Sequence, residues 1–313
     1  MNSIEITPDR EKQMLDELAS IAESHVNSSN TELELLSVDP ETYPAQRAYH
    51  VEGFPLSARE IEGLGVLAND KFPDIQSHLN DIEEESLVIE SVGKLLNDGN
   101  NVVLVTNHGD LIDIALAEAA VYCKLYDQGV VPRSGIIISK IVSLMGVRLG
   151  ENVIPAADAL KFLCNDIFLT FPRTETIRNS NLGSIVAEDI DRNNEQMIGK
   201  INEALGQGGM LLGMAASGSV DKTAGDNIIR LETLSQGTSR IMMQPNTFVL
   251  PVAIWLQGKH TVFEICDNPK SLPDVSSTHA AMEGISKSLT DKVEGKTFKY
   301  SSVRGLGKLS IES

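Results

Sequence analysis

The sequence predicts an α/β fold: a mostly parallel central sheet flanked by helices, with an N-terminal helical segment. From residue 99 onward, short runs rich in Val, Ile and Leu alternate with longer segments of helical periodicity. Before that residue, apolar side chains recur at helical spacing instead. The chain has 313 residues and is 42% hydrophobic, which is enough for a substantial core.

The N-terminal region, residues 1–98, is predicted to be helical and to add no strand to the sheet. Its helical patterns cover residues 9–26, 57–70 and 81–99. Loops that contain Pro44, Pro55 and Pro73 separate these three helical patterns. We therefore expect two parts, a helical region over residues 1–98 and an α/β domain over residues 99–313.

The α/β domain is predicted from a change in the hydrophobic period after Gly99. Strands are expected at 101–107, 135–139, 166–171, 210–217, 247–256 and 260–266. Helices are expected at 111–127, 192–209 and 277–295, and residues 142–150 are expected to form an irregular link. Strands separated by helices in this way are typical of a largely parallel sheet covered on both faces.

Composition excludes several classes of function. The net charge is −18 and no basic stripe is interleaved with aromatic residues, so nucleic acid is not an expected partner. Residues 1–100 carry 21 acidic and 6 basic side chains, a net −15, so the remainder of the chain is close to neutral. No apolar run approaches the roughly 20 residues of a membrane span.

The expected compartment is the cytoplasm, or the plastid stroma if a transit peptide has been removed. The acidic, polar N-terminus resembles neither a signal peptide nor an Arg-rich transit peptide. The three cysteines lie far apart in apolar runs without a CxxC spacing, which is typical of reduced, buried thiols.

The stretch "LVTNHGDLIDIAL", residues 104–116, contains the first candidate site. Asn107 and His108 follow an apolar strand, and Asp113 comes five residues after His108 at the start of a helix. A carboxylate beside a histidine fixes the ring tautomer and stabilises the imidazolium that forms when the ring takes a proton. The spacing alone is a weak signal, but the strand end is where α/β folds place ligands.

The stretch "GGMLLGMAASGSVDKT", residues 208–223, is the second. A strand runs into Ser217 and Gly218, and Lys222 follows. Glycine at such a corner lets the backbone present N–H groups to an anion or oxyanion, although a plain turn is the more common meaning of this pattern. It is not a nucleophile elbow, because Ala215 stands where that motif needs glycine.

Together these blocks resemble the glycerol-3-phosphate acyltransferase family, the His-x4-Asp acyltransferases, over roughly residues 80–267. The soluble plastid-type enzymes are the most similar, since their "APSGGRDR" block is similar to "AASGSVDK" and their last block is similar to "VLPVAI" (residues 249–254). The resemblance implies transfer of a fatty acyl group to a hydroxyl of glycerol 3-phosphate or a related glycerophospholipid precursor. It implies His108 as general base with Asp113.

The same resemblance implies the remaining site residues and the partners. Asn107, Arg173, Ser217, Gly218 and Lys222 would bind substrate, with Arg173 and Lys222 on the acceptor's phosphate. No metal or cofactor is implied; an acyl-CoA or acyl carrier protein thioester is the co-substrate, and transient membrane contact is compatible with this chemistry. One departure is Val220, which stands where the family has a basic residue.

Two other functions remain open on the sequence. The protein could be a serine hydrolase that pairs Ser217 with His108 and Asp113, although the missing elbow counts against it. It could also be a non-catalytic acyl- or lipid-binding member of the fold, which the intact His108 and Asp113 pair argues against and Val220 mildly favours.

Overall fold

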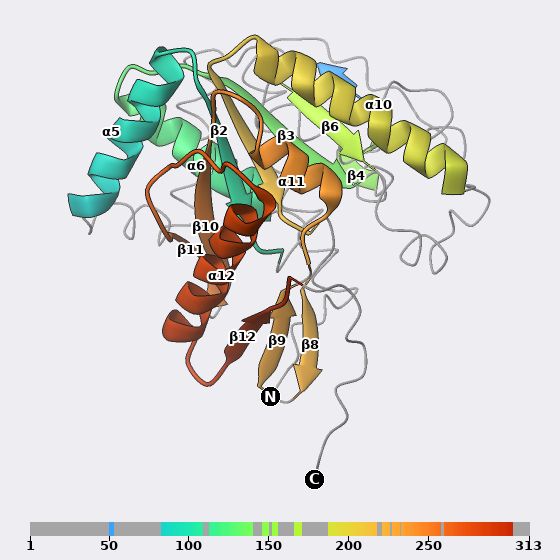
Figure 1. The fold of residues 1–313 in the computed structure, drawn as a ribbon. Helices are drawn as coiled ribbons and strands as arrows, with labels where there is room; N and C mark the ends of the chain where they lie inside the picture. The colour runs from blue at the N-terminus through green and yellow to red at the C-terminus, as the bar shows by residue number, and fades with distance from the viewer. Residues whose placement is uncertain are drawn as a thin grey trace.

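The computed structural model describes the chain in segments. These are residues 50–52, 83–108, 113–139, 146–149, 152–155, 166–170, 187–217, 221–225, 227–231, 233–257 and 260–302. The arrangement of the helices and strands in these segments is shown in Figure 1.

The described residues contain a seven-stranded sheet in the order β1-β6-β3-β7-β2-β10-β11. The five inner strands run parallel, and the two edge strands run antiparallel to their neighbours. In chain order the strands are β1 (His50–Glu52), β2 (Asn101–Thr106), β3 (Arg133–Ser139), β6 (Asp166–Thr170), β7 (Met210–Ala215), β10 (Thr247–Gln257) and β11 (His260–Ile265). The predicted α/β fold with a mostly parallel central sheet is confirmed.

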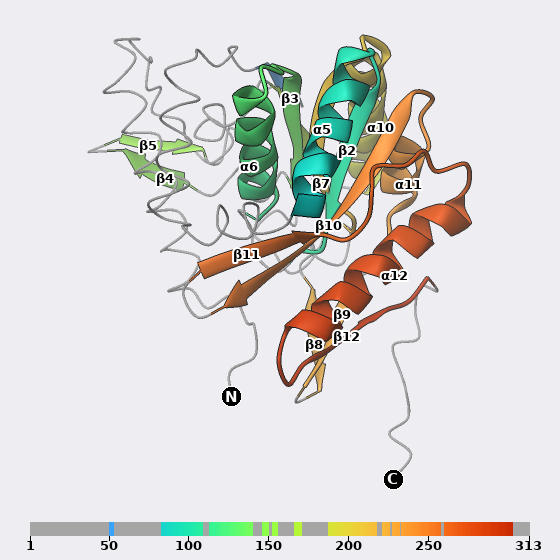
Figure 2. The ribbon, with the colours of Figure 1, turned by 90° about the vertical axis from the view of Figure 1, so that its left-hand side faces the viewer.

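Helices cover both faces of this sheet, as Figure 2 shows. On one face α5 contacts β2, and α6 contacts β7 and β3; the other face carries α10, α11 and α12. Their bounds are α5 (Glu83–Asn97), α6 (Asp113–Asp127), α10 (Ala187–Gly206), α11 (Gln236–Met242) and α12 (Val275–Lys292). None of the helices within the described segments is both long and apolar enough to cross a bilayer.

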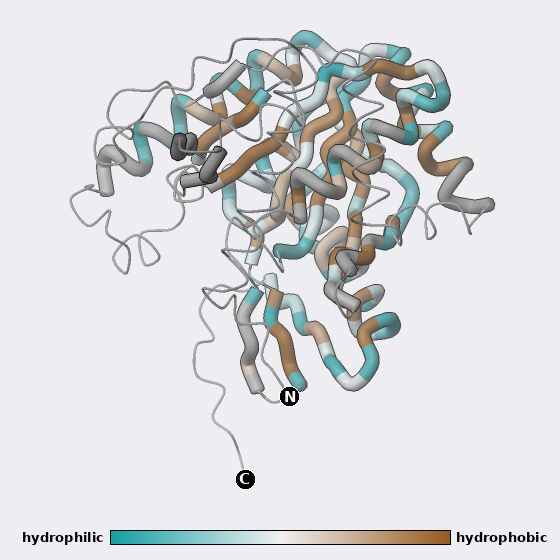
Figure 3. Tube along the Cα trace, turned by 180° about the vertical axis from the view of Figure 1, so that it is seen from behind, coloured by the Kyte–Doolittle hydropathy of each residue, from teal (hydrophilic) through white to brown (hydrophobic). Residues whose placement is uncertain are grey.

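The inner strands form because they are apolar along their whole length. All six residues of β2, "NVVLVT", are buried, and so are all six of β7, "MLLGMA". A parallel strand covered on both faces requires such a run, because each of its two side-chain rows meets a helix layer. The hydrophobic colour concentrates on these central strands in Figure 3.

The helices are amphipathic and have defined ends. In α5 the buried residues Ile89, Val92 and Leu96 recur at helical spacing. The chain then turns at Gly99, whose φ of 80° favours glycine. At the other end of the chain, α12 begins with a capping box, in which the Asp274 carboxylate accepts from the backbone N–H of Ser277.

Two smaller sheets complete the described structure. A three-stranded sheet has the order β12-β9-β8, and its strand β12 packs on α12. A two-stranded hairpin pairs β4 with β5. These strands are β4 (Gly146–Leu149), β5 (Asn152–Pro155), β8 (Lys222–Gly225), β9 (Ile228–Leu231) and β12 (Thr297–Tyr300).

The prediction that residues 1–98 add no strand is wrong, because His50–Glu52 pairs antiparallel with β6 at the sheet edge. The irregular link expected over residues 142–150 contains β4. The helical patterns at 9–26 and 57–70 lie outside the described residues, so the boundary after residue 98 stays a prediction.

Candidate active site at the carboxyl edge of the sheet

Asn107 fixes the end of β2 against β10. Its side-chain Nδ2 donates to the Ile254 carbonyl at 2.8 Å, and its Oδ1 accepts from the Ile254 N–H at 2.7 Å. All three groups are buried, so the amide replaces one rung of the β2–β10 ladder where β2 itself has ended. The backbone of the next residue, His108, therefore starts from a fixed position.

His108 is held from its other side by Asp221. The His108 N–H donates to Asp221 Oδ2 at 3.1 Å, and the Asp221 N–H donates to the His108 carbonyl at 2.8 Å. These two bonds close a ring between the backbone of one residue and the backbone and carboxylate of the other. Both residues are buried, at 8% and 9% exposed. His108 is therefore clamped at the carboxyl edge of the sheet.

Ser217 reaches the same edge from the neighbouring strand. Strands β2 and β7 pair up to Thr106 and Ala215, and the Ala216 N–H then donates to the Thr106 carbonyl at 3.0 Å. His108 and Ser217 each stand two residues beyond that last pair, and Ser217 is 5% exposed. The structure thus brings three predicted site residues, Asn107, His108 and Ser217, to one edge.

The other predicted site residues are described only in part. Asp113 is the first residue of α6, and Lys222 is the first residue of β8, directly after Asp221. The backbones of these two residues are described, whereas their side chains are not. Gly218 and Arg173 lie outside the described residues. Their predicted contacts with His108 or with substrate stay predictions.

Asn107 has a task that sequence reasoning did not predict. Its amide oxygen and one amide N–H are taken up by Ile254, so the structure gives it a positioning role. If Asn107 also contacts substrate, as predicted, its second amide N–H is the donor that remains for this contact. The ring that Asp221 forms with His108 was also not predicted, because it joins positions 113 residues apart in sequence.

Sequence reasoning also missed the buried acid Glu118 on the inner face of α6. Its side chain is fully buried, and among the described residues neither carboxyl oxygen has a partner that meets hydrogen-bond geometry, although the Ser134 hydroxyl lies near enough to affect the carboxyl. Burial raises the pKa of this carboxyl well above its usual range, and the Ser134 hydroxyl opposes the shift only in part. The signal in the sequence was a single acid within the apolar run "IALAEAAVYC".

Gly213 of β7 is what lets α6 approach the sheet at this point. A Cβ atom on residue 213 would lie 3.1 Å from Glu118 Cβ and 3.2 Å from Ile114 Cγ2. Those separations are tighter than ordinary van der Waals contact, so a larger residue would push α6 outward. Because α6 begins at Asp113, five residues after His108, the packing at Gly213 also sets the position of the Asp113 backbone.

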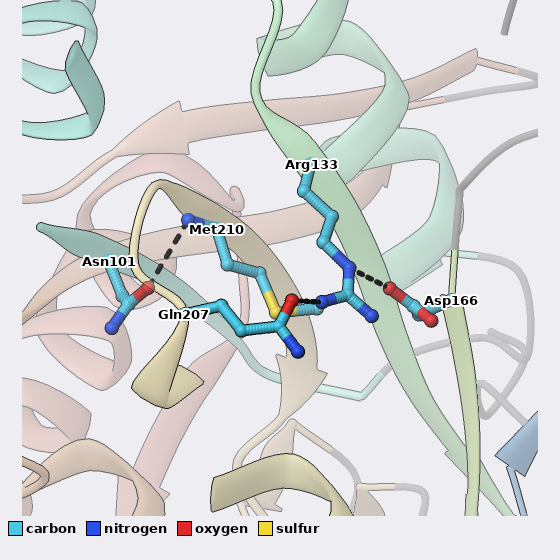
Figure 4. Close-up of polar contacts among 5 residues, drawn as sticks. All are labelled: Asn101, Arg133, Asp166, Gln207 and Met210. Carbon is cyan, nitrogen blue, oxygen red and sulfur yellow. Dashed lines mark hydrogen bonds and ion pairs between the residues drawn. The ribbon is translucent and has the colours of Figure 1, made fainter. Parts of the chain in front are cut away.

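A second polar cluster lies at the opposite, amino edge of the sheet (Figure 4). Arg133 of β3 donates from Nε to the buried Asp166 of β6 and also donates to Gln207, both at 2.5 Å. Asn101 accepts from the Met210 N–H at 3.2 Å and donates to the Leu205 carbonyl at 2.9 Å. These contacts satisfy backbone and charged groups at the starts of the strands, which is a structural task.

No known protein family and no curated protein matches this chain in comparisons of sequence. Within the described segments, no group of three or more His, Cys, Asp or Glu side chains is arranged to hold a metal ion.

Proposed function

We propose that this protein is an O-acyltransferase that moves a fatty acyl group from a thioester to an acceptor hydroxyl, with His108 as general base. The observation that carries the proposal is a buried histidine clamped at the end of a central parallel strand. The preceding residue, Asn107, is bonded to Ile254 of β10, and Asp221 bonds the backbone of His108 itself. A catalytic base gains from such support because the reacting groups must meet in a fixed geometry.

In this mechanism the His108 ring takes the proton of the acceptor hydroxyl as the oxygen attacks the thioester carbonyl. The tetrahedral intermediate then collapses, the C–S bond breaks, and the leaving thiolate takes the proton back from the imidazolium. The backbone N–H of Gly218 or of a neighbour stabilises the oxyanion. Asp113 orients the ring, and no acyl-enzyme forms.

The substrates follow from the sequence resemblance. The donor is acyl-CoA or acyl carrier protein, and the acceptor is glycerol 3-phosphate or a related precursor whose phosphate contacts Arg173 and Lys222. Arginine suits this task because its guanidinium binds phosphate in a bidentate manner. A net charge of −18 opposes binding of these anions at long range, but exposed charges are screened beyond about 8 Å at physiological ionic strength.

The test is transfer from labelled acyl-CoA and acyl carrier protein to a panel of glycerol phosphates and unphosphorylated glycerols. Replacement His108→Ala should lower turnover by about 10²–10⁴-fold, because a positioned base contributes that much. The matched control is His279→Ala, since His279 lies in α12 and bonds Tyr300 instead. Near-normal turnover by folded His108→Ala, or no transfer to any acceptor, would contradict the proposal.

Lys222→Ala separates the acceptor classes. A charge-assisted phosphate contact is worth about 1.5–3 kcal/mol, so this change should raise the acceptor's KM by about 10-fold or more and leave the donor's KM unchanged. Equal acceptor KM values in the variant and the wild type would remove Lys222 from the site. An unphosphorylated alcohol would then be the better acceptor.

A second candidate is a serine hydrolase that uses Ser217 as nucleophile. It is favoured by the register, since Ser217 and His108 lie equally far beyond the last pair of adjacent strands. Mass spectrometry after rapid mixing with acyl-CoA distinguishes the two functions. An acyl group on Ser217, lost in Ser217→Ala, supports the hydrolase; its absence during active turnover supports direct transfer.

A further inference from the structure

We propose that Asp221 is a positioning residue for His108 and that its negative charge raises the basicity of the His108 ring. This rests on the proposed function in one respect, since it assigns a partner to the base of that reaction. The supporting geometry is the ring of two hydrogen bonds. Asp221 Oδ2 lies 3.1 Å from the backbone nitrogen of His108, and the backbone nitrogen of Asp221 lies 2.8 Å from the His108 carbonyl oxygen.

The burial of Asp221 is what separates this role from an ordinary turn. A carboxylate that is 9% exposed loses much of its hydration, which is costly unless hydrogen bonds and charges compensate. To hold the His108 N–H, a neutral asparagine or serine would serve equally well and would avoid that cost. A negative charge at this position does more than hold an N–H, because it also favours the protonated form of a nearby imidazole.

Other ionisable residues belong to the elements that flank His108 and Asp221 in the chain. Asp113 is the first residue of α6, five residues after His108, and Lys222 follows Asp221 directly. Glu118 lies within α6, where burial favours its neutral form. The Asp221 carboxylate bonds the backbone N–H of His108 itself, so its distance from the ring is limited by the length of a single residue.

Asp221 also joins the site to the small sheet. It immediately precedes β8, β8 pairs with β9, and β9 pairs with β12. Asp221 therefore connects the His108 backbone to β8 through the two bonds of the ring. This explains why a residue that continues into a separate sheet can still act on the base.

The experiment is an NMR titration of the histidine ring protons in the wild type and in Asp221→Asn, with His108 assigned by its absence in His108→Gln. Asparagine keeps an acceptor oxygen but removes the charge, so the His108 midpoint should move to lower pH by about 1 unit. The matched control is Asp98→Asn, which removes one carboxylate just before the opposite end of β2 and should leave the midpoint in place.

An unchanged His108 midpoint in folded Asp221→Asn overturns the proposal. If the variant does not fold, the wild type supplies the test: the His108 amide proton must move upfield when the carboxylate that it contacts becomes protonated in acid, and a static amide signal also overturns the proposal. Where acyl transfer is measurable, Asp221→Asn should lower kcat at an unchanged acceptor KM, by up to about 10-fold, which is the limit for complete proton transfer when the ring midpoint falls by 1 unit.

The two proposals fail separately. A shifted titration without acyl transfer to any acceptor leaves Asp221 as the partner of His108 and removes the proposed function. Acyl transfer with an unmoved titration leaves the function and removes the role of Asp221.

Discussion

Strand β2 is held at each end by an asparagine, and this symmetry allows a paired test of the site. Asn101 bridges the Leu205 carbonyl and the Met210 N–H, and Asn107 bridges the carbonyl and N–H of Ile254. The two side chains are 1% and 3% exposed. Replacing either by alanine removes two buried hydrogen bonds of the same kind, but only Asn107 adjoins His108.

We expect different losses of stability and different effects on His108. Asn107→Ala leaves the Ile254 N–H and carbonyl without the amide, at about 1–3 kcal/mol per group, so the free energy of unfolding should fall by about 2–6 kcal/mol. That is a large share of the 5–15 kcal/mol typical of a folded domain. Asn101→Ala leaves the Met210 N–H without the amide, but the Leu205 carbonyl still accepts from the Gly208 N–H at 3.0 Å, so the expected fall is about 1–3 kcal/mol. The His108 ring signals should move in Asn107→Ala and stay in place in Asn101→Ala.

Urea unfolding at 25 °C measures the first effect, and NMR of the histidine ring protons at low urea measures the second. A loss below about 1 kcal/mol in either variant would show that the bridge is replaced by water or by relaxation of the chain. Unmoved His108 signals in folded Asn107→Ala would show that the asparagine does not position the base. The hydrogen bonds with Asp221 would then be the contacts that hold the His108 backbone.

Three further predictions follow from the described residues. Burial raises the pKa of Glu118 above its unfolded value, so the contribution of Glu118 to stability is present at low pH and is lost as the pH rises through the folded pKa. The melting temperature of Glu118→Gln should therefore depend less on pH than that of the wild type between pH 5 and 9. Parallel curves of melting temperature against pH would contradict this. Burial likewise raises the pKa of the Cys266 thiol to about 12, so peptide-level mass spectrometry should find Cys266 slowly alkylated by iodoacetamide at pH 7.5 in the folded protein and rapidly in urea. Asp113→Asn should keep the fold and lower acyl transfer, and a crystal structure in which the Asp113 and His108 side chains point apart would refute their pairing.

The central strands could be predicted from sequence because their signal is local. Strands β2 and β7 are continuous apolar runs, and α6 and α12 have helical periodicity over four or more turns. His108 could be singled out for the same reason, since the apolar strand and the histidine lie within the eight residues from Asn101 to His108.

The small sheet could not be predicted, because its strands depend on distant partners. β9 has only four residues, and it is held by β12 through pairs such as Ile228 with Thr297. The same holds for β1, whose three residues pair with β6 more than 100 positions later. Nothing within such short segments distinguishes a strand from a loop. The role of Asp221 was missed for the same reason.

The order of synthesis has a consequence for the bridge at Asn107. The asparagine leaves the ribosome 147 residues before Ile254, its only partner in that bridge. At about 5–20 residues per second the delay is roughly 7–30 s. During this time the apolar strand β2 first lacks both of its sheet neighbours, β7 and β10, and then lacks β10 alone. Contacts of such long range form slowly, so His108 reaches its final position among the last parts of the molecule. A nascent chain shorter than about 254 residues therefore exposes an open sheet edge at β2, beside the future site. We expect chaperones to bind nascent chains that are still too short to contain β10.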